Sequence, residues 1–277
     1  MKLNLSKYPV QIVCILIVVL LTNTVYAQSY FLNLRGAPTQ GGLIIAQTNT
    51  SAVVTINGKK ANLTDDGYFM FGFGRFEGKP IELSISYQNN TYKATIPVTV
   101  REFPTEVING LPASKVNPPQ KVYTQIKNDN IKVKKARSYL DFRKDFLQDF
   151  IWPSNGRISG VYGSRRILNG EPKRPHYGMD IANVKGTEVV SPAAGIVRLA
   201  ETGMYYTGGT IIIDHGYGLS TTFMHLSQVD IEVGTVVIQG EKIGEIGMTG
   251  RATGPHLDWR LNLGNIRLDP QLIIPKQ

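Results

Sequence analysis

The chain of 277 residues contains a single cysteine, Cys14, which lies in an apolar run near the N-terminus. One thiol cannot form an internal disulfide, so the fold must be held together by packing alone. Histidine is also scarce: the chain has four, and all of them fall from His176 onward. The first half of the chain has no histidine and no recognisable catalytic constellation. We expect a scaffold, spacer or binding module there.

Acidic side chains are fewer than basic ones, with 21 Asp and Glu against 30 Lys and Arg, and the formal net charge is +9. A chain with this balance is attracted to anionic polymers or membrane surfaces. Nucleic acid is a poor partner for it, because no nucleic-acid-binding motif is present and the N-terminus indicates export.

Residues 1–27 have the pattern of a cleaved signal peptide. Two lysines precede an apolar run at residues 10–21, and Val25-Tyr26-Ala27 offers a cleavage site. The run is too short to cross a bilayer comfortably, so cleavage is favoured over a retained membrane anchor. We expect the protein in the periplasm or cell envelope, with secretion as the second choice.

Residues 28–110 contain short runs of alternating apolar and polar residues. Residues 52–56, 81–87 and 92–98 are examples, and turn formers such as Asn57-Gly58 separate them. Strands of this length and spacing predict a small antiparallel β-sandwich with immunoglobulin-like architecture.

Residues 111–153 form a proline-containing linker followed by a basic helix. Helical periodicity is predicted over residues 120–150, with Pro119 acceptable as the opening residue and a break allowed at Asp129-Asn130. Aromatic residues recur there at three- and four-residue spacing: Tyr139, Phe142, Phe146 and Phe150. A solvated linker face is one interpretation of the many lysines and arginines. Contact with an anionic wall polymer or lipid is the other.

Short β-like runs and glycine turns resume at residue 154 and predict an all-β domain over residues 154–277. Residues 195–199, 210–214 and 242–247 are examples. All four histidines of the chain fall inside this domain. We therefore look for chemistry there.

Four metal-competent side chains of this domain lie in two short clusters. His176 and Asp180 are four residues apart, and His256 and Asp258 are two apart. In a strand, residues i and i+2 point to the same face, so the second pair can face one groove. Together the clusters can supply three nitrogen or oxygen ligands, which is the number that a catalytic zinc uses while it keeps a position open for water.

Residues 156–269 resemble the lysostaphin-type, LytM-domain zinc endopeptidases, which cut peptide bridges in bacterial cell walls. The matching stretches occur in the family's order: residues 158–165, 176–182, 186–195, 213–218, 223–227 and 247–257. The resemblance covers about two-fifths of the chain and implies the duplicated hybrid motif of that family. It does not extend to the N-terminal half.

The resemblance implies a role for each site residue. His176, Asp180 and Asp258 match the three ligands of one zinc ion, and His256 and His225 match two catalytic histidines that do not bind metal. A zinc-bound water would attack the scissile carbonyl of a peptidoglycan peptide stem. His256 would accept the proton of that water, while His225 would orient the water or stabilise the oxyanion.

Asp258 departs from the family pattern, which has a second histidine at this position. Aspartate is a zinc ligand, but a set of one histidine and two aspartates makes the site formally neutral and the metal a weaker Lewis acid. Harder ions such as Mn²⁺ would be tolerated better. We expect an active peptidase because every site residue is still a competent ligand or base. The alternative is a catalytically silent domain that binds wall peptides or activates a separate amidase.

Several nearby residues have secondary roles. His215 lies in a turn between two strands and is expected to be structural. Arg260 shares the groove face and either touches a substrate carboxylate or pairs with Asp258. Tyr205 and Tyr206 are candidates for the groove rim. The basic helix or the sandwich could also cover the groove and restrain activity.

Overall fold

The computed structural model describes residues 33–274. The predicted signal peptide lies outside these residues. The protein is mainly β, with 42% strand and 11% helix, as the sequence predicts. Among the described residues, no helix has the length and apolar character needed to span a bilayer.

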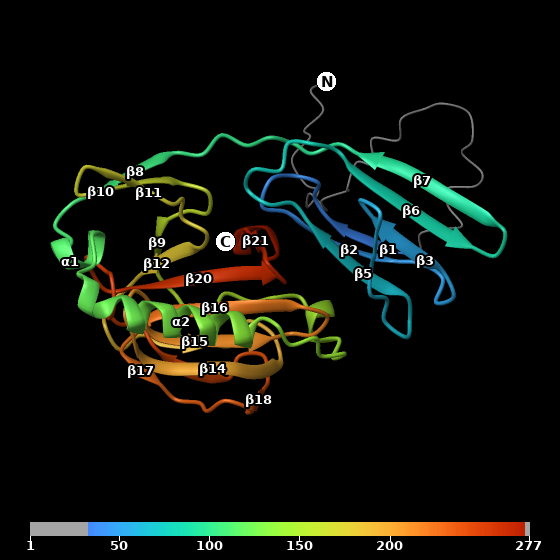
Figure 1. The fold of residues 1–277 in the computed structure, drawn as a ribbon. Coiled ribbons are helices and arrows are strands. Elements are labelled where there is room, and N and C mark those ends of the chain that lie inside the picture. Colours follow the sequence, from blue (N-terminus) through green and yellow to red (C-terminus); the bar gives the residue numbers. More distant parts are fainter. Residues whose placement is uncertain (1–32, 275–277) are drawn as a thin grey trace, which may run out of the picture.

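Two antiparallel sheets form the N-terminal unit, drawn in blue to cyan in Figure 1. One has the strand order β1-β2-β5 and the other β4-β3-β6-β7. The strands are β1 (Asn33–Gly36), β2 (Leu43–Gln47), β3 (Val53–Ile56), β4 (Lys59–Lys60), β5 (Tyr68–Gly72), β6 (Ile81–Tyr87) and β7 (Asn90–Ile96). The antiparallel β structure predicted here is confirmed, whereas the immunoglobulin-like architecture stays a prediction.

Strands β2 and β5 of the first sheet are buried on both faces. Alternate residues of these strands, such as Ile44 and Phe69, belong to the core of the N-terminal unit. The residues between them, such as Ile45 and Met70, belong to a core cluster shared with the C-terminal domain, which also contains Leu268. The two parts of the chain are therefore joined by an apolar interface.

Polar contacts reinforce this interface. The guanidinium of Arg101 lies 2.8 Å from the carboxylate of Asp269, whose side chain is 2% exposed. Asp269 also donates its backbone N–H to the carbonyl of Gly41, and Arg75 donates to the carbonyl of Gly163 at 2.6 Å.

The C-terminal domain is built on a large sheet with the order β18-β14-β15-β16-β20-β12-β9, to which β21 adds beside β20. A second sheet has the order β13-β19-β17. The elements are β9 (Arg157–Gly160), β10 (Arg165–Leu168), β11 (Glu171–Lys173), β12 (Met179–Ala182), β13 (Glu188–Val190), β14 (Gly195–Met204), β15 (Gly208–Asp214), β16 (Leu219–Leu226), β17 (Gln228–Val229), β18 (Val236–Val237), β19 (Lys242–Glu245), β20 (His256–Leu263), β21 (Ile266–Leu268) and the 3₁₀ turn η4 (Pro270–Leu272).

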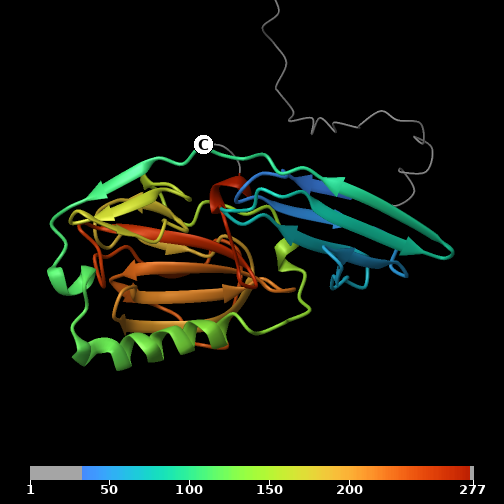
Figure 2. The ribbon, with the colours of Figure 1, turned by 45° about the horizontal axis from the view of Figure 1, so that its top comes forward.

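The segment after the N-terminal sheets contributes a strand to the C-terminal domain. β8 (Thr105–Ile108) pairs in parallel with β10, which forms a hairpin with β11. Figures 1 and 2 show the chain crossing from β7 to this small sheet along one side of the molecule. The N-terminal half of the chain thus reaches the part of the domain that carries Arg165 to Leu168.

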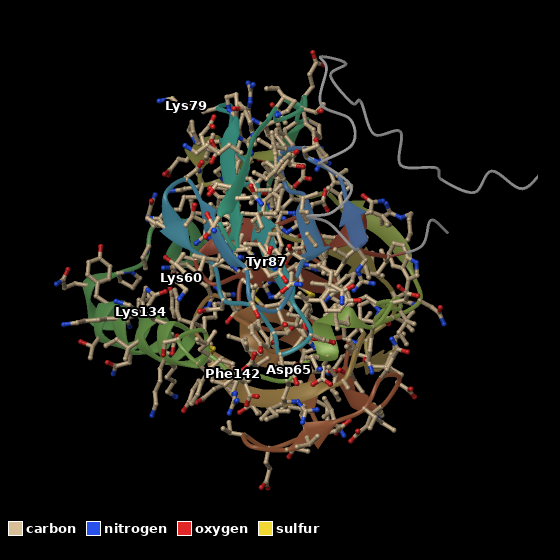
Figure 3. The ribbon with its side chains drawn as sticks, turned by 90° about the vertical axis from the view of Figure 1, so that its right-hand side faces the viewer. Lys60, Asp65, Lys79, Tyr87, Lys134 and Phe142 are labelled. Carbon is tan, nitrogen blue, oxygen red and sulfur yellow. The ribbon has the colours of Figure 1, made fainter. Side chains whose placement is uncertain are left out.

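Helical structure follows in α1 (Ala113–Val116), η2 (Gln120–Val122) and α2 (Tyr123–Ala136). α2 is continuous through Asp129-Asn130, and it packs through Val133 and Ala136 on Leu199 and Ile212 of the large sheet. Its exposed side carries several lysines together with Tyr123 and Ile131, and Lys134 extends away from the protein (Figure 3). The predicted start of the helix after Pro119 is confirmed.

The predicted helix over residues 120–150 is wrong beyond Ala136. Apart from the short turn η3 (Asp145–Leu147), residues 137–150 run without helix across the C-terminal domain. Phe146 and Phe150 are buried in that domain's core, whereas Phe142 is 68% exposed. The aromatic spacing reflects these tertiary contacts. The predicted domain boundary at residue 154 therefore runs through a single hydrophobic core, with Phe146 and Phe150 on one side of it and most of that core on the other.

Candidate metal centre

Three predicted ligands come together in the C-terminal domain: His176, Asp180 and Asp258. One ligand atom from each lies within 4.8 Å of the others, and all three residues are buried. Nε2 of His176 is 3.1 Å from Oδ1 of Asp180 and 3.3 Å from Oδ2 of Asp258. Imidazole and carboxylate groups at these separations can share one cation.

The sheet explains why these side chains meet. β12 and β20 are antiparallel neighbours, and their register places Asp180 directly opposite Asp258. Opposed residues of an antiparallel pair project from the same face, about 5 Å apart. His176 precedes β12 and is fixed by its backbone, which donates to the carbonyl of Ser164 at 2.9 Å and accepts from the N–H of Gly163 at 2.8 Å.

The residues present fit a bound metal ion. Both ring nitrogens of His176 and Oδ1 of Asp180 are buried without a hydrogen-bond partner. Leaving such atoms unsatisfied costs about 1–3 kcal/mol each, and two of them, Nε2 of His176 and Oδ1 of Asp180, lie 3.1 Å apart. One nitrogen and two carboxylate oxygens suit zinc, and also harder ions such as Mn²⁺.

Charge dominates the electrostatics of this cluster. Burial opposes a proton on His176, but the carboxylates of Asp180 and Asp258 outweigh it and raise the pKa of His176. Burial likewise disfavours the ionised form of Asp258, yet Arg260 and His176 hold the pKa of that carboxyl well below its usual range. A cation is therefore favoured between the two carboxylates, and a metal ion would displace the proton on His176.

Two arginines hold the carboxylates of Asp258 and Asp180. Arg260 donates to both oxygens of Asp258, at 2.9 and 2.7 Å, which answers the question left open by the sequence. Arg166 donates to Oδ2 of Asp180 at 2.7 Å and lies 3.4 Å from Glu106 of β8. Sequence reasoning did not find Arg166 or Glu106. The parallel pairing of β8 with β10 brings them together across 60 residues, and no local pattern signals it.

His225 and His256 stand side by side next to the cluster, with ring centroids 4.7 Å apart. Nδ1 of each lies 2.8 Å from a backbone carbonyl, that of Thr249 for His225 and that of Gly254 for His256. A carbonyl only accepts, so in each neutral ring the proton is on Nδ1 and Nε2 carries the lone pair. Nε2 of His256 is 3.9 Å from Oδ1 of Asp180, so that lone pair is close to the proposed ligands.

His225 is held in an unusual backbone conformation. Its φ is +66°, in the left-handed region that non-glycine residues rarely adopt. Its backbone N–H donates to the carbonyl of Thr207 at 2.8 Å. Burial, followed by the neighbouring His256, lowers the pKa of His225 to about 4. Residues in such strained conformations occur often at functional sites.

The remaining predicted residues have structural partners. His215 is fully buried, with Nδ1 2.7 Å from the carbonyl of Ala194 and Nε2 2.8 Å from the hydroxyl of Thr221. The hydroxyl of Tyr205 donates to the carbonyl of Ser114 in α1, so this tyrosine anchors the linker to the domain.

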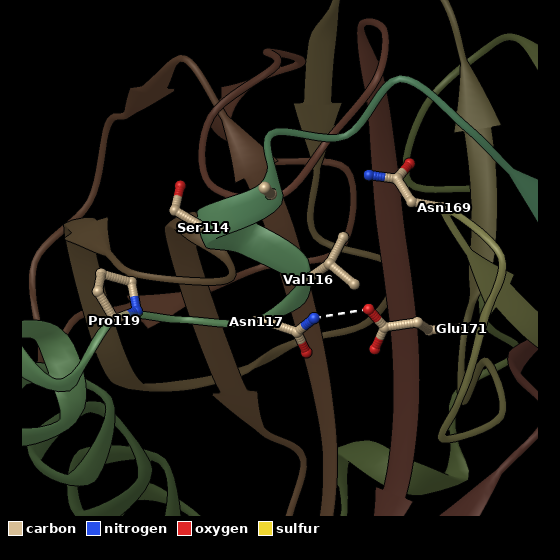
Figure 4. A pocket seen from close by; sticks show the side chains of 7 residues that line it. Ser114, Val116, Asn117, Pro119, Asn169 and Glu171 are labelled. Carbon is tan, nitrogen blue, oxygen red and sulfur yellow. Dashed lines mark hydrogen bonds between the residues drawn. The ribbon is translucent and has the colours of Figure 1, made fainter.

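A pocket of about 330 Å³ lies beside α1 and the β10–β11 hairpin (Figure 4). Its amide and carboxylate side chains are already paired. Asn117 donates to Glu171 at 2.6 Å, and Asn169 exchanges hydrogen bonds with the backbone of Leu111. We assign no chemistry to this pocket.

Comparison with known proteins identifies the domain. Residues 174–270 match Peptidase family M23. The C-terminal domain is an M23 peptidase domain. This confirms the family resemblance predicted from the sequence, and the matched region contains all the proposed ligands and both neighbouring histidines.

Two relatives of the M23 domain come from Vibrio cholerae. The peptidoglycan DD-endopeptidase ShyA is 39% identical over 110 residues, which is 39% of this chain and 25% of ShyA. The peptidoglycan DD-endopeptidase ShyC is 31% identical over 145 residues, 51% of this chain and 30% of ShyC. This chain therefore spans less than a third of either relative.

A solved structure extends the likeness beyond the M23 domain. A crystal structure of a protein from Pseudomonas aeruginosa assigned to peptidase M23 has a TM-score of 0.67 and 24% identity, covering 86% of this chain and 95% of that one. At this identity the likeness concerns the fold alone. That fold includes much of the N-terminal half.

Proposed function

We propose that this protein is a zinc-dependent endopeptidase of the cell envelope that hydrolyses peptide cross-links of bacterial peptidoglycan. The observation that carries the proposal is the cluster of unsatisfied buried ligand atoms beside two histidines with fixed tautomers. Support for the substrate comes from relatives that are peptidoglycan DD-endopeptidases.

His176, Asp180 and Asp258 would hold the metal. When bound, zinc would supply a Lewis acid for the scissile carbonyl and acidify a water molecule. Oδ1 of Asp180 and Oδ2 of Asp258 would face the metal, since they lie 3.1 and 3.3 Å from Nε2 of His176. Arg166 binds the other oxygen of Asp180, and Arg260 binds both oxygens of Asp258. Hydrogen bonds to the outer atoms of metal ligands fix their orientation.

His256 would be the general base. Its Nδ1–H is committed to the carbonyl of Gly254, so Nε2 is free to accept a proton and deliver it later to the leaving amine. His225 would orient the attacking water. Because the pKa of His225 is low and its own N–H points to Thr249, its neutral ring offers an acceptor rather than a donor for an oxyanion.

Digestion of purified sacculi tests this function. Wild-type protein with zinc should release peptides cut at cross-links, whereas His256→Ala and chelator-treated wild type should release none. Thermal melts of both proteins check that the variant is folded. Sacculi that bind the wild type but yield no peptides would instead support the catalytically silent, amidase-activating alternative. Contact of the basic helix with wall polymer, and restraint of activity by the N-terminal half, stay predictions.

A further inference from the structure

Asp258 and Arg260 form one tightly matched pair. They are two residues apart on β20 and therefore project from the same face. Nε of Arg260 donates to Oδ1 of Asp258 at 2.9 Å, and Nη2 donates to Oδ2 at 2.7 Å. The aspartate side chain is 1% exposed and the arginine side chain 25%. Two parallel bonds between a guanidinium and a carboxylate fix both position and orientation.

Packing leaves the pair little freedom. A Cβ atom at Gly178 would lie 2.4 Å from Oδ1 of Asp258 and 2.6 Å from Cγ of Arg260. Such approaches are shorter than any ordinary contact, so the absence of a side chain at Gly178 is what lets the two residues lie there. The backbone before β12 thus lies close against the carboxylate of Asp258 and the aliphatic stem of Arg260.

The pair also changes the charge of the site. Asp258 alone contributes one negative charge, and together with Asp180 it would cancel the two positive charges of zinc. Arg260 returns one positive charge at hydrogen-bond distance. Asp258 and Arg260 together are therefore neutral, as an imidazole ligand is. Within residues 33–274, Asp258 is the one acidic residue that forms an ion pair with Arg260.

Arg166 does not do the same for Asp180. It donates a single hydrogen bond to Oδ2, and its guanidinium is shared with Glu106 at 3.4 Å. Its positive charge is balanced by two carboxylates rather than one. Arg260 is thus the arginine whose ion pair is formed with a single proposed ligand.

We propose that Asp258 and Arg260 act as one charge-neutral metal ligand, in which Asp258 supplies the oxygen and Arg260 is the positioning residue that orients it and cancels its charge. The inference rests on the proposed zinc site. It predicts that the effect of removing Arg260 depends on which residue stands at position 258.

A double-mutant cycle on the full chain tests this dependence. Zinc affinity is measured by competition with a chromophoric chelator for the wild type, Arg260→Gln, Asp258→His and the double variant. In the wild type, Arg260→Gln should weaken zinc binding, roughly 10–100-fold as for other outer partners of ligands. Asp258→His leaves a guanidinium without a counter-charge beside the dication, so it should weaken binding too. Adding Arg260→Gln to it should then restore affinity.

Two ratios of zinc affinity decide the outcome: that of Arg260→Gln to the wild type, and that of the double variant to Asp258→His. A difference of about tenfold or more between the effects of Arg260→Gln in the two backgrounds supports the proposal, and a smaller difference overturns it. If the wild type binds no zinc, both the proposed function and this inference are contradicted. Zinc binding without coupling overturns the inference alone.

Further variants separate positioning from stability. Arg260→Lys keeps the positive charge but cannot form the two parallel hydrogen bonds, so its zinc affinity should lie between those of the wild type and Arg260→Gln. This comparison holds even if Asp258→His does not fold. The visible spectrum of the cobalt-substituted protein should change in Arg260→Gln. Arg267→Gln is the matched control. Arg267 lies over the ring of Tyr177 at 4.2 Å, and its removal should leave zinc affinity within about threefold. Equal losses in both arginine variants would show a general charge effect and contradict the pairing.

Discussion

Replacing Phe146 by alanine should destabilise the M23 domain strongly, although Phe146 precedes the matched family region. Its side chain is 1% exposed, lies in the core that contains Trp259, and meets the ring of Tyr217 edge-on at 5.6 Å. Truncating a buried phenylalanine removes its transfer free energy and leaves a cavity. The expected loss in the free energy of unfolding is roughly 3–5 kcal/mol.

Phe142→Ala is the matched control. Phe142 has the same helical spacing in the sequence and also meets Tyr217 at 5.6 Å, but it is 68% exposed. Its removal should cost about 1 kcal/mol or less. Urea unfolding followed by tryptophan fluorescence compares the two variants. Equal, small losses would mean that residues 137–150 are a separable linker, and the core described for this domain would be wrong.

Three further perturbations test other parts of the molecule. Burial lowers the pKa of His215 from 6.5 to about 4, so the unfolded chain gains a proton before the folded one does. Stability should therefore fall by about 3 kcal/mol as the pH drops from 6.5 to 4, and urea titrations of His215→Gln should lose this component. Arg101→Ala should lower the free energy of unfolding in urea by roughly 3–5 kcal/mol, because it leaves Asp269 buried and without its ion-pair partner. An unchanged free energy would mean that the two parts of the chain do not dock. Free zinc at about a hundred times its dissociation constant should stabilise the protein by about 2.7 kcal/mol in thermal melts, and His176→Ala should abolish that gain.

The grouping of His256 with Asp258 was predictable because their spacing is local, whereas the division of the site into three ligands and two catalytic histidines came from the family resemblance and stays a prediction. His256 and Asp258 obey the two-residue period of a strand, and the structure places both on β20. The sequence left two alternatives for the partner of Arg260, a substrate carboxylate or Asp258, since a residue on the same face can turn inward or outward. Its choice depends on Gly178, which belongs to another segment. Periodicity alone cannot settle such a contact.

The helix over residues 137–150 was mispredicted because aromatic spacing has two possible causes. Phe146 and Phe150 recur at four residues in both a helix and an extended segment that meets two separate pockets. Here the backbone N–H of Phe146 donates to the carbonyl of His215, and that of Tyr217 to the carbonyl of Asp141. Tertiary hydrogen bonds replaced the helical ones. The apolar run Leu43-Ile44-Ile45-Ala46 was not singled out in the sequence, and its burial on both faces follows from the contact between the two parts of the chain.

The route by which the N-terminal half reaches the metal site follows from one strand pairing. β8 sets Glu106 beside Arg166 at 3.4 Å, and Arg166 donates to Asp180 at 2.7 Å. Glu106 also accepts a hydrogen bond from the backbone N–H of Val161 at 3.3 Å, so its carboxylate is held by the C-terminal domain. Because the hydrogen bonds of ligand carboxylates orient them, the segment before the M23 domain helps to shape the proposed site. A chain beginning at residue 154 would retain all three proposed ligands but lose this support and the buried Phe146, so ligand retention alone would not preserve the geometry.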